Sequence, residues 1–573
     1  MFRRDRVSNR FRWLTCLLLG GLLVTLTTPA FSQDAEEVIP EGAPIPLVIV
    51  NLASVESLMT DIDYMFKTIN RPDMMEVIQG LLGNVNDLGG LDRKKPLGVM
   101  LFMKQGVVPT FAPVAYLPTD KLTTLIDTLE IGPVQAARVA GQTDRYELTT
   151  RGQTLELKLD NGYSLISNDV ELLDSDLPSP TAITKTMSSK YDLAISADIT
   201  AVPKAMRNLF LDLLRAQSDA QLQQRDDEPK AQYEARRAAG MNNIDSLEAV
   251  LRDGQRFTIG FNASPEEKAI LIDLSLDVTA ESKLGEDLKS FAGAKSRFAP
   301  LVDNRVPMII SASFNLADTD QKVWKTFLES GREMLVNPEN VEYDAFDAPT
   351  VDRVFDALKA TVDTGKVDAF MKFEGQPPNP FVLIGGIQMR NTEALSTGLM
   401  QMGQELDRRI DESNGSFDIN HETHRGMAIH RFTATRSSPW DRRTYGGPPS
   451  VYVGAGFGAL WFAVGGEDSV SVLGDAIDQV LQPTGREVVA QSTAPFHFVL
   501  NFGSWFGLPE NEERRRGQAF RERAKEAFSE GGDQLKFELR PTENGIRWHI
   551  RLDEGFIRLI GSGITSQYDR NQL

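Results

Sequence analysis

The sequence contains one cysteine and five histidines among 573 residues. So few thiols exclude a disulfide scaffold, an iron–sulfur protein and a zinc fold with cysteine ligands. The motifs G-x-S-x-G, G-x-x-x-x-G-K-[ST], H-E-x-x-H and C-x-x-C are all missing, which removes several common routes to catalysis. We therefore expect no cofactor, no metal and no motif-defined catalytic residue.

Positive charge is also scarce. The chain has 61 basic against 80 acidic residues and a formal net charge of -19. Binding to nucleic acid requires concentrated lysine and arginine, so the balance argues against a nucleic-acid partner. The apolar fraction of 41% and the charged fraction of 25% are typical of a globular protein.

The N-terminus has the three parts of a secretory signal. Five arginines fall within residues 1–12, an apolar run follows from Trp13 to Leu26, and Ala30-Phe31-Ser32 offers a small-residue cleavage site. This pattern predicts a signal peptide over residues 1–32 and export to the periplasm, the cell envelope or the medium. An uncleaved N-terminal anchor is the alternative. No later run approaches 18 apolar residues, so we expect no transmembrane segment after cleavage.

Short motifs recur in the same order in the two halves of the chain. The matches pair residues 46–50 with 307–311, 102–104 with 370–372, 145–146 with 431–432, and 256–259 with 536–539. Four matches in order, with similar offsets, indicate an internal duplication. Any α+β chain also alternates strands and helices, which gives some of this order by chance.

Residues 269–276 partly alternate apolar and polar side chains, as expected for an antiparallel sheet with one solvated face. The predicted fold class is α+β: two tandem copies of a module of antiparallel sheet covered by helices, with a charged helical insertion. The predicted organisation is a signal peptide (1–32), a flexible lead-in (33–43), a first module (44–303), a second module (304–565) and a C-terminal tail (566–573).

The insertion covers residues 203–240. Its first helix starts near Pro203 and carries an apolar stripe of Met206, Leu209, Phe210, Leu213 and Leu214. We expect Pro229 to break this helix and Gly240 to end a second, charged one. Residues 509–529 are similarly charged. Each stretch is either a solvated helix with mixed charges or a projecting arm for a partner protein.

Export, acidity, duplication and the inserted segment Arg225-Asp226-Asp227-Glu228-Pro229-Lys230-Ala231-Gln232-Tyr233-Glu234-Ala235-Arg236-Arg237 together form a recognisable pattern. The chain resembles a group of large secreted or cell-envelope proteins of unknown function from planctomycete-type bacteria. The resemblance implies a location and an architecture, and carries no functional residue.

Three histidines cluster at positions 421, 424 and 430. Their flanks predict two strands with a turn near Arg425-Gly426, and residues three apart on one strand point to opposite faces. Ordinary surface histidines are therefore favoured over a zinc site, although a hairpin could bring His421 near the returning strand. His497 and His549 fall on strands, facing away from the neighbouring aromatic residues.

One segment outside the expected core invites a ligand or partner. Residues 435–449 are rich in proline and glycine, which predicts an irregular loop. The candidate binding side chains in this loop are Arg436, Trp440, Arg442, Arg443 and Tyr445. Aromatic rings beside arginines suit stacking and bidentate contact with a sugar or an anion. The alternative is that Trp440 folds back onto its own domain.

The favoured hypothesis is an exported, non-catalytic envelope protein whose duplicated module presents a binding or structural surface. Its partner would be a protein, glycan or lipid of the envelope. The second hypothesis is a carrier that encloses an apolar ligand between sheet and helices, with a dry pocket in each half. The third is an unrecognised hydrolase that uses carboxylates in a cleft.

Overall fold

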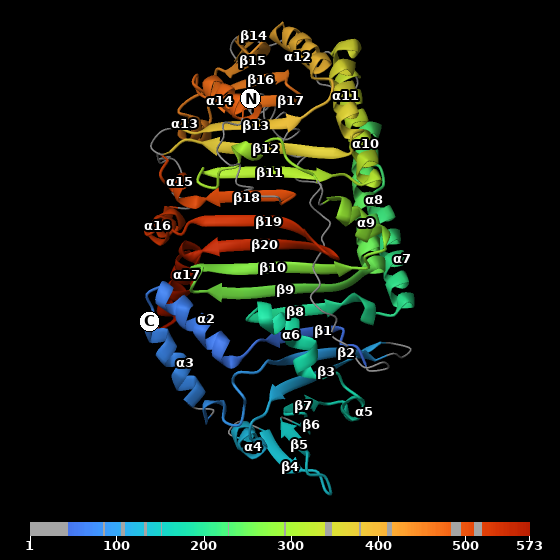
Figure 1. Ribbon diagram of the computed structural model, residues 1–573, viewed down its shortest axis with the longest axis vertical. Coiled ribbons are helices and arrows are strands. Elements are labelled where there is room, and N and C mark those ends of the chain that lie inside the picture. The colour runs from blue at the N-terminus through green and yellow to red at the C-terminus, as the bar shows by residue number, and fades with distance from the viewer. Residues whose placement is uncertain are drawn as a thin grey trace.

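The computed structural model describes residues 44–572 except 84–85, 105–108, 131–133, 151, 227, 292–293, 338–345, 377–379, 409–414, 483–493 and 509–517. The predicted signal peptide and the whole of the lead-in lie outside the described residues. Within them, one continuous antiparallel sheet of twenty strands runs along the molecule, like the rungs of a ladder (Figure 1). The fold is α+β, as the alternation of the sequence predicted.

The first half of the chain contributes ten adjacent strands. Their spatial order is β4-β5-β6-β7-β3-β2-β1-β8-β9-β10. Their bounds are β1 Val48–Leu52, β2 Leu97–Lys104, β3 Thr110–Pro118, β4 Val134–Arg138, β5 Arg145–Thr150, β6 Gln153–Asp160, β7 Tyr163–Ser167, β8 Leu193–Asp198, β9 Gly254–Ser264 and β10 Ala269–Val278.

The second half repeats this order with each strand number raised by ten, from β14 at its outer edge to β20. The bounds are β11 Met308–Asn315, β12 Lys366–Glu374, β13 Val382–Gln388, β14 Gly415–His424, β15 Met427–Ala434, β16 Ser450–Gly456, β17 Ala459–Gly465, β18 Phe496–Asn501, β19 Gln534–Thr542 and β20 Gly545–Asp553. The four sequence matches fall on β1 and β11, β2 and β12, β5 and β15, and β9 and β19, which hold the same places.

The two halves join where β10 pairs with β20, at a junction that we call the seam. Nine residue pairs form this ladder, from Ala269 opposite Asp553 to Asp277 opposite Gly545. A half-turn about an axis between these strands carries the strand order of one half onto that of the other. The sheet is therefore continuous across the molecule, and each half supplies one central strand.

The main helices follow equivalent strands and lie along the two sides of the ladder (Figure 1). One side holds α7 (Lys204–Gln221), α8 (Lys230–Asp253), α9 (Lys283–Phe291), α10 (Asp318–Val336) and α11 (Ala348–Val362). The other holds α2 (Val55–Thr68), α3 (Asp73–Gly83), α15 (Phe502–Phe506), α16 (Gln518–Ala527) and α17 (Glu554–Gln572). No helix within the described ranges has the length and apolar character needed to cross a bilayer.

The sheet has two faces with different coverings. We call front the face on which α6 (Pro180–Lys190) and α14 (Ser469–Leu481) pack near the two ends, against residues such as Met100 and Trp461. The back face is covered beside the seam by α8, α9 and α10, which bury Leu276, Leu539 and Ile546. Because this core combines strands of both halves, neither half has a fully separate interior.

Two predicted boundaries are wrong. Gly240 does not end the second inserted helix, because α8 continues through it to Asp253, with Gly254 as its C-cap. Burial of Ile244 on this longer helix outweighs the weak helix propensity of one glycine. At the other end of the chain, α17 continues to Gln572 and so includes the start of the expected tail at residue 566.

Candidate functional site

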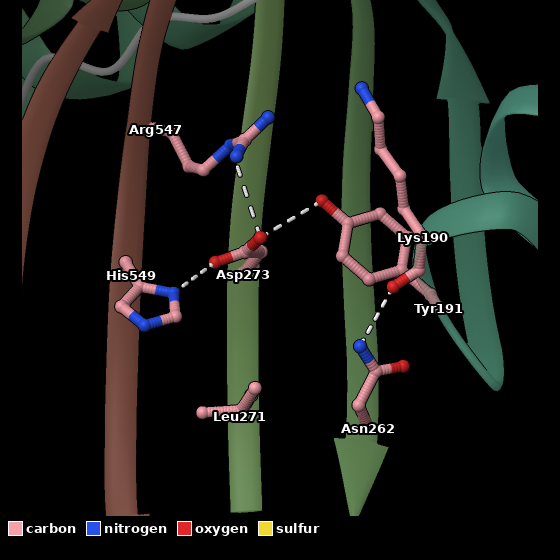
Figure 2. Close-up of a pocket in the computed structure, with 7 residues that line it drawn as sticks. All are labelled: Lys190, Tyr191, Asn262, Leu271, Asp273, Arg547 and His549. Carbon is pink, nitrogen blue, oxygen red and sulfur yellow. Dashed lines mark hydrogen bonds and ion pairs between the residues drawn. The ribbon is translucent and has the colours of Figure 1, made fainter. Parts of the chain in front are cut away.

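A small pocket opens on the front face at the seam (Figure 2). Its volume is about 250 Å³. The lining residues are Lys190, Tyr191, Asn262, Leu271, Asp273, Arg547 and His549. The last two come from β20 and the others from the first half, so both halves build this seam pocket.

Asp273 is the centre of the pocket. Its carboxylate lies 2.7 Å from Nδ1 of His549 and accepts a hydrogen bond of 3.0 Å from the Tyr191 hydroxyl. Nε of Arg547 stands 3.8 Å from the same carboxylate. Asp273 and His549 are directly opposite in the β10–β20 register, which explains why the two side chains meet on one face.

A glycine makes room for Tyr191. Gly260 lies opposite Asp273 on β9, and a Cβ there would come within 2.3 Å of the Tyr191 ring. The ring can lie over the strand only because that side chain is missing. Asn262 fixes the chain around Tyr191, since its Nδ2 donates to the Lys190 carbonyl and its Oδ1 accepts from the Asp192 amide, both at 2.7 Å. The tyrosine is thereby aimed at the seam.

Burial and nearby positive charges shift the pKa values of the carboxylates on β10 in opposite directions. Burial raises the pKa of Asp273, but the hydrogen bond from His549 and the nearby Arg547 outweigh it and leave the pKa below the usual range. Four residues further along β10, burial raises the pKa of Asp277 to about 6, although Arg256 and Lys190 oppose the shift. The pocket thus contains one ionised carboxylate, Asp273, while the poorly solvated Asp277 lies outside its lining on the same strand.

The Asp273–His549 pair orients the imidazole. An ionised Asp273 holds the proton on Nδ1, which leaves the lone pair of Nε2 available in the neutral ring. The His549 side chain is 32% exposed, and no described residue bonds to its Nε2. Nε2 can therefore accept a proton or hydrogen bond from a bound molecule. No serine or cysteine within the described ranges forms the hydrogen bond to it that an activated nucleophile needs.

A second histidine–carboxylate pair on the same face is closed. His497 Nδ1 lies 3.1 Å from Glu538 and its Nε2 lies 2.8 Å from Asn304 Oδ1. Burial raises the pKa of Glu538, but His497 and Lys536 lower it to about 2. Both ring nitrogens are occupied and the histidine is 1% exposed, so this pair has a structural role. The two histidines do face away from their aromatic neighbours, as predicted.

The clustered histidines form no metal site. His421 bonds to Asp418 and His424 to Asp478, both at 2.8 Å. His430 is buried, and its Nδ1 accepts from the Asn420 amide at a bulge of β14. The predicted turn at residues 425–426 is present, with φ of 48° and 86°. Among the described residues no group of three or more histidines, cysteines or carboxylates is placed to hold a metal ion.

The predicted loop at 435–449 contains a short helix, α13 (Pro439–Tyr445), so the expectation of an irregular loop was wrong there. Ser438 and Asp441 form a capping box, which starts the helix despite the surrounding prolines and glycines. Tyr445 is buried, while Trp440 is 45% exposed and packs edge-on against it at 5.4 Å. Trp440 thus partly folds back onto its own domain.

The arginines of that segment differ in exposure. Arg442 donates to the Ser437 carbonyl at 2.8 Å, and Arg443 and Arg436 lie on either side of it in the sequence. Arg436 and Arg442 are exposed, whereas Arg443 is partly buried. The segment remains a predicted partner surface, with Trp440 as its most exposed aromatic ring.

A second pocket, of about 170 Å³, lies beside the end of β13 and is lined mainly by polar residues: Thr361, Thr364, Lys366, Gln388, Met389 and Arg390. Neither pocket has the apolar lining that a carrier of an apolar ligand requires. One signal for the seam pocket is visible in the sequence, namely polar and charged residues alternating along β10 and β20. It could not indicate that these strands pair.

No protein-family model matches this sequence, and comparison with curated proteins and with solved structures finds no similar chain.

Proposed function

We propose that the protein is an exported binding protein whose seam pocket holds a small carboxylate that also carries a hydroxyl group. The observation that carries the proposal is the convergence of Lys190, Arg547 and His549 on one small pocket of a strongly acidic chain. Basic side chains in a concave site attract and orient a carboxylate. The secretory pattern of residues 1–32 supports export to the envelope or beyond.

The two ends of such a ligand have different partners. Its carboxylate binds between Lys190 and Arg547, which stand on opposite sides of the pocket (Figure 2). Its hydroxyl donates to Nε2 of His549, because Asp273 holds the proton on the other ring nitrogen. Asp273 contacts the ligand little, since Tyr191 and His549 already occupy its oxygens.

The test is calorimetric titration with a panel of small hydroxy acids at low ionic strength. We expect saturable binding that weakens at least tenfold in Lys190→Gln and Arg547→Gln, because each removes one charge-assisted contact. The matched control is Arg551→Gln, on the same strand as Arg547 but outside the pocket lining. No saturable binding, or equal binding by all the variants, would refute the proposal.

A hydrolase is the second candidate, favoured by the open Nε2 of His549 next to an ionised Asp273. The imidazole would act as a general base on water, while Lys190 and Arg547 hold the substrate. In that case esters of the panel acids would be hydrolysed to the acid and an alcohol, and Asp273→Asn and His549→Gln would each lower kcat by at least a hundredfold. Binding without turnover supports the binding protein instead.

A further inference from the structure

Four aliphatic side chains form an exposed row on the back face of the first half. Val99, Val50, Ile195 and Ile259 are directly opposite one another on β2, β1, β8 and β9. Their exposed fractions lie between 37% and 42%. Leu193, also on β8, adds a side chain that is 40% exposed. A contiguous apolar patch of this kind on a sheet is typical of an interaction surface.

The same face of the other half is covered. The strands equivalent to β2, β1, β8 and β9 are β12, β11, β18 and β19. Their back face carries Ala312, Phe496 and Leu539, which are exposed by 1%, 8% and 2%. Helices α8, α9 and α10 pack on these residues. The aliphatic row is thus the uncovered counterpart of a surface that elsewhere in the chain accepts helices.

A helix in the described part of the chain has an exposed apolar stripe. Leu209, Phe210 and Leu213 on α7 are 61%, 52% and 63% exposed, and their spacing places them on one side of the helix. We call these three residues the α7 stripe. The opposite side of α7 is anchored to α8, with Leu211 buried between the two helices.

The stripe cannot turn onto its own aliphatic row. Arg207 of α7 donates to the Leu251 carbonyl at 2.7 Å, and Arg215 pairs with Asp245 at 3.2 Å and with Glu248. These contacts hold α7 against α8 with the stripe facing outward. A rotation that buried the stripe would break all of them and expose Leu211. In this arrangement the α7 stripe is therefore not available to the row of its own molecule.

We propose that the protein forms a symmetric dimer in which the α7 stripe of each copy packs on the aliphatic row of the other. At roughly 200 Å² for a large apolar side chain, the stripe and the row each expose about 300 Å². If both are fully covered, two reciprocal contacts bury about 1,200 Å², which reaches the lower end of the size range of stable interfaces. Both surfaces belong to the same chain, so one twofold axis satisfies both.

Sedimentation velocity over a hundredfold range of concentration tests the proposal. We expect a dimer that becomes monomeric in Leu209→Ser/Leu213→Ser, which changes only the stripe, and in Ile195→Thr/Ile259→Thr, which changes only the row. Threonine retains the strand preference of isoleucine, so the row variant should fold. Phe520→Ser, at a ring of α16 that is 50% exposed, is the matched control and should remain dimeric.

Cysteine pairing identifies the contact itself. The only natural cysteine is Cys16, so variants with Leu213→Cys and with Ile195→Cys in a Cys16→Ser background each contain one thiol. An equimolar mixture should form an intermolecular disulfide under mild oxidation, at least ten times faster than a mixture of Leu213→Cys with Phe520→Cys. A monomer at every concentration would overturn the proposal. So would a dimer that survives both surface variants, because another surface would then mediate association.

Discussion

Asp273 and His549 are separated by 276 residues in the chain, yet they face each other across the two central strands and share a hydrogen bond of 2.7 Å. Each half contributes one member of the pair. A change at this contact is therefore expected to affect the junction of the two halves as well as the pocket.

Replacing Asp273 with asparagine should lower stability by about 1–3 kcal/mol at neutral pH, because the charge-assisted bond to His549 is lost. The pKa of Asp273 is lowered in the folded protein, so its contribution is present above the ordinary value of 3.8 and lost as the pH falls through the folded value. Urea unfolding from pH 7 down to pH 3 should show the gap between wild type and Asp273→Asn closing below about pH 4. Glu266→Gln, at an exposed carboxylate, is the control. A gap that stays constant with pH would contradict the assignment.

Ionisation of Asp277 should have the opposite effect on stability to that of Asp273. Burial raises its pKa to about 6, and its Oδ1 is buried without a hydrogen-bond partner among the described residues. Ionisation therefore costs stability as the pH rises from about 4 to about 6, and the cost persists above that range. We expect Asp277→Asn to stabilise the protein by up to about 2 kcal/mol at pH 7 and hardly at all at pH 4. Thermal unfolding at the two pH values checks this, and destabilisation at pH 7 would show that the carboxylate is better solvated than its burial indicates.

Gly260 and Tyr191 should behave as a coupled pair. A methyl group at Gly260 meets the Tyr191 ring at 2.3 Å, so Gly260→Ala should displace the ring and destabilise the protein by about 1–3 kcal/mol. In Gly260→Ala/Tyr191→Ala the clash is gone, and the alanine at position 260 should then cost little. A double-mutant cycle from urea unfolding measures this coupling. Additive effects of the two substitutions would mean that the ring does not rest on the glycine.

The two halves should unfold together. Leu276 from the first half and Leu539 and Ile546 from the second share one core, and α9 packs on β11, β19 and β20. Calorimetry should therefore give a single transition with matching calorimetric and van't Hoff enthalpies. Residues 44–303 expressed alone would leave β10 unpaired on one side and should not give a cooperative transition. Two separated transitions in the whole chain would indicate independent domains.

Local patterns in the sequence predicted much of the fold. The alternation at 269–276 predicted an antiparallel strand, and the strand flanks of His497 and His549 correctly placed both imidazoles opposite the aromatic rings. In the same way, the predicted turn at Arg425-Gly426 follows from backbone preferences that act over two residues. These predictions hold because each depends on neighbours along the chain.

The seam pocket depends on distant pairing and could not be predicted in the same way. Lys190 and Tyr191 end the α6 segment, while Arg547 and His549 belong to the penultimate element of the chain. Only the β10–β20 register brings them together. The α13 helix was missed for a different reason, since its Ser438–Asp441 capping box uses a side-chain hydrogen bond that outweighed the turn-forming residues around it.

The two outermost strands limit how far the sheet can grow. In the described part of the chain, β4 pairs only with β5 and β14 only with β15, so each presents an open edge. Strand β4 is five residues long, and a bulge interrupts β14 between Asp418 and Glu422. Short or irregular edges resist the addition of another chain. Both edges of the twenty-stranded sheet are therefore poor templates for pairing with another chain, which protects the protein from forming fibres.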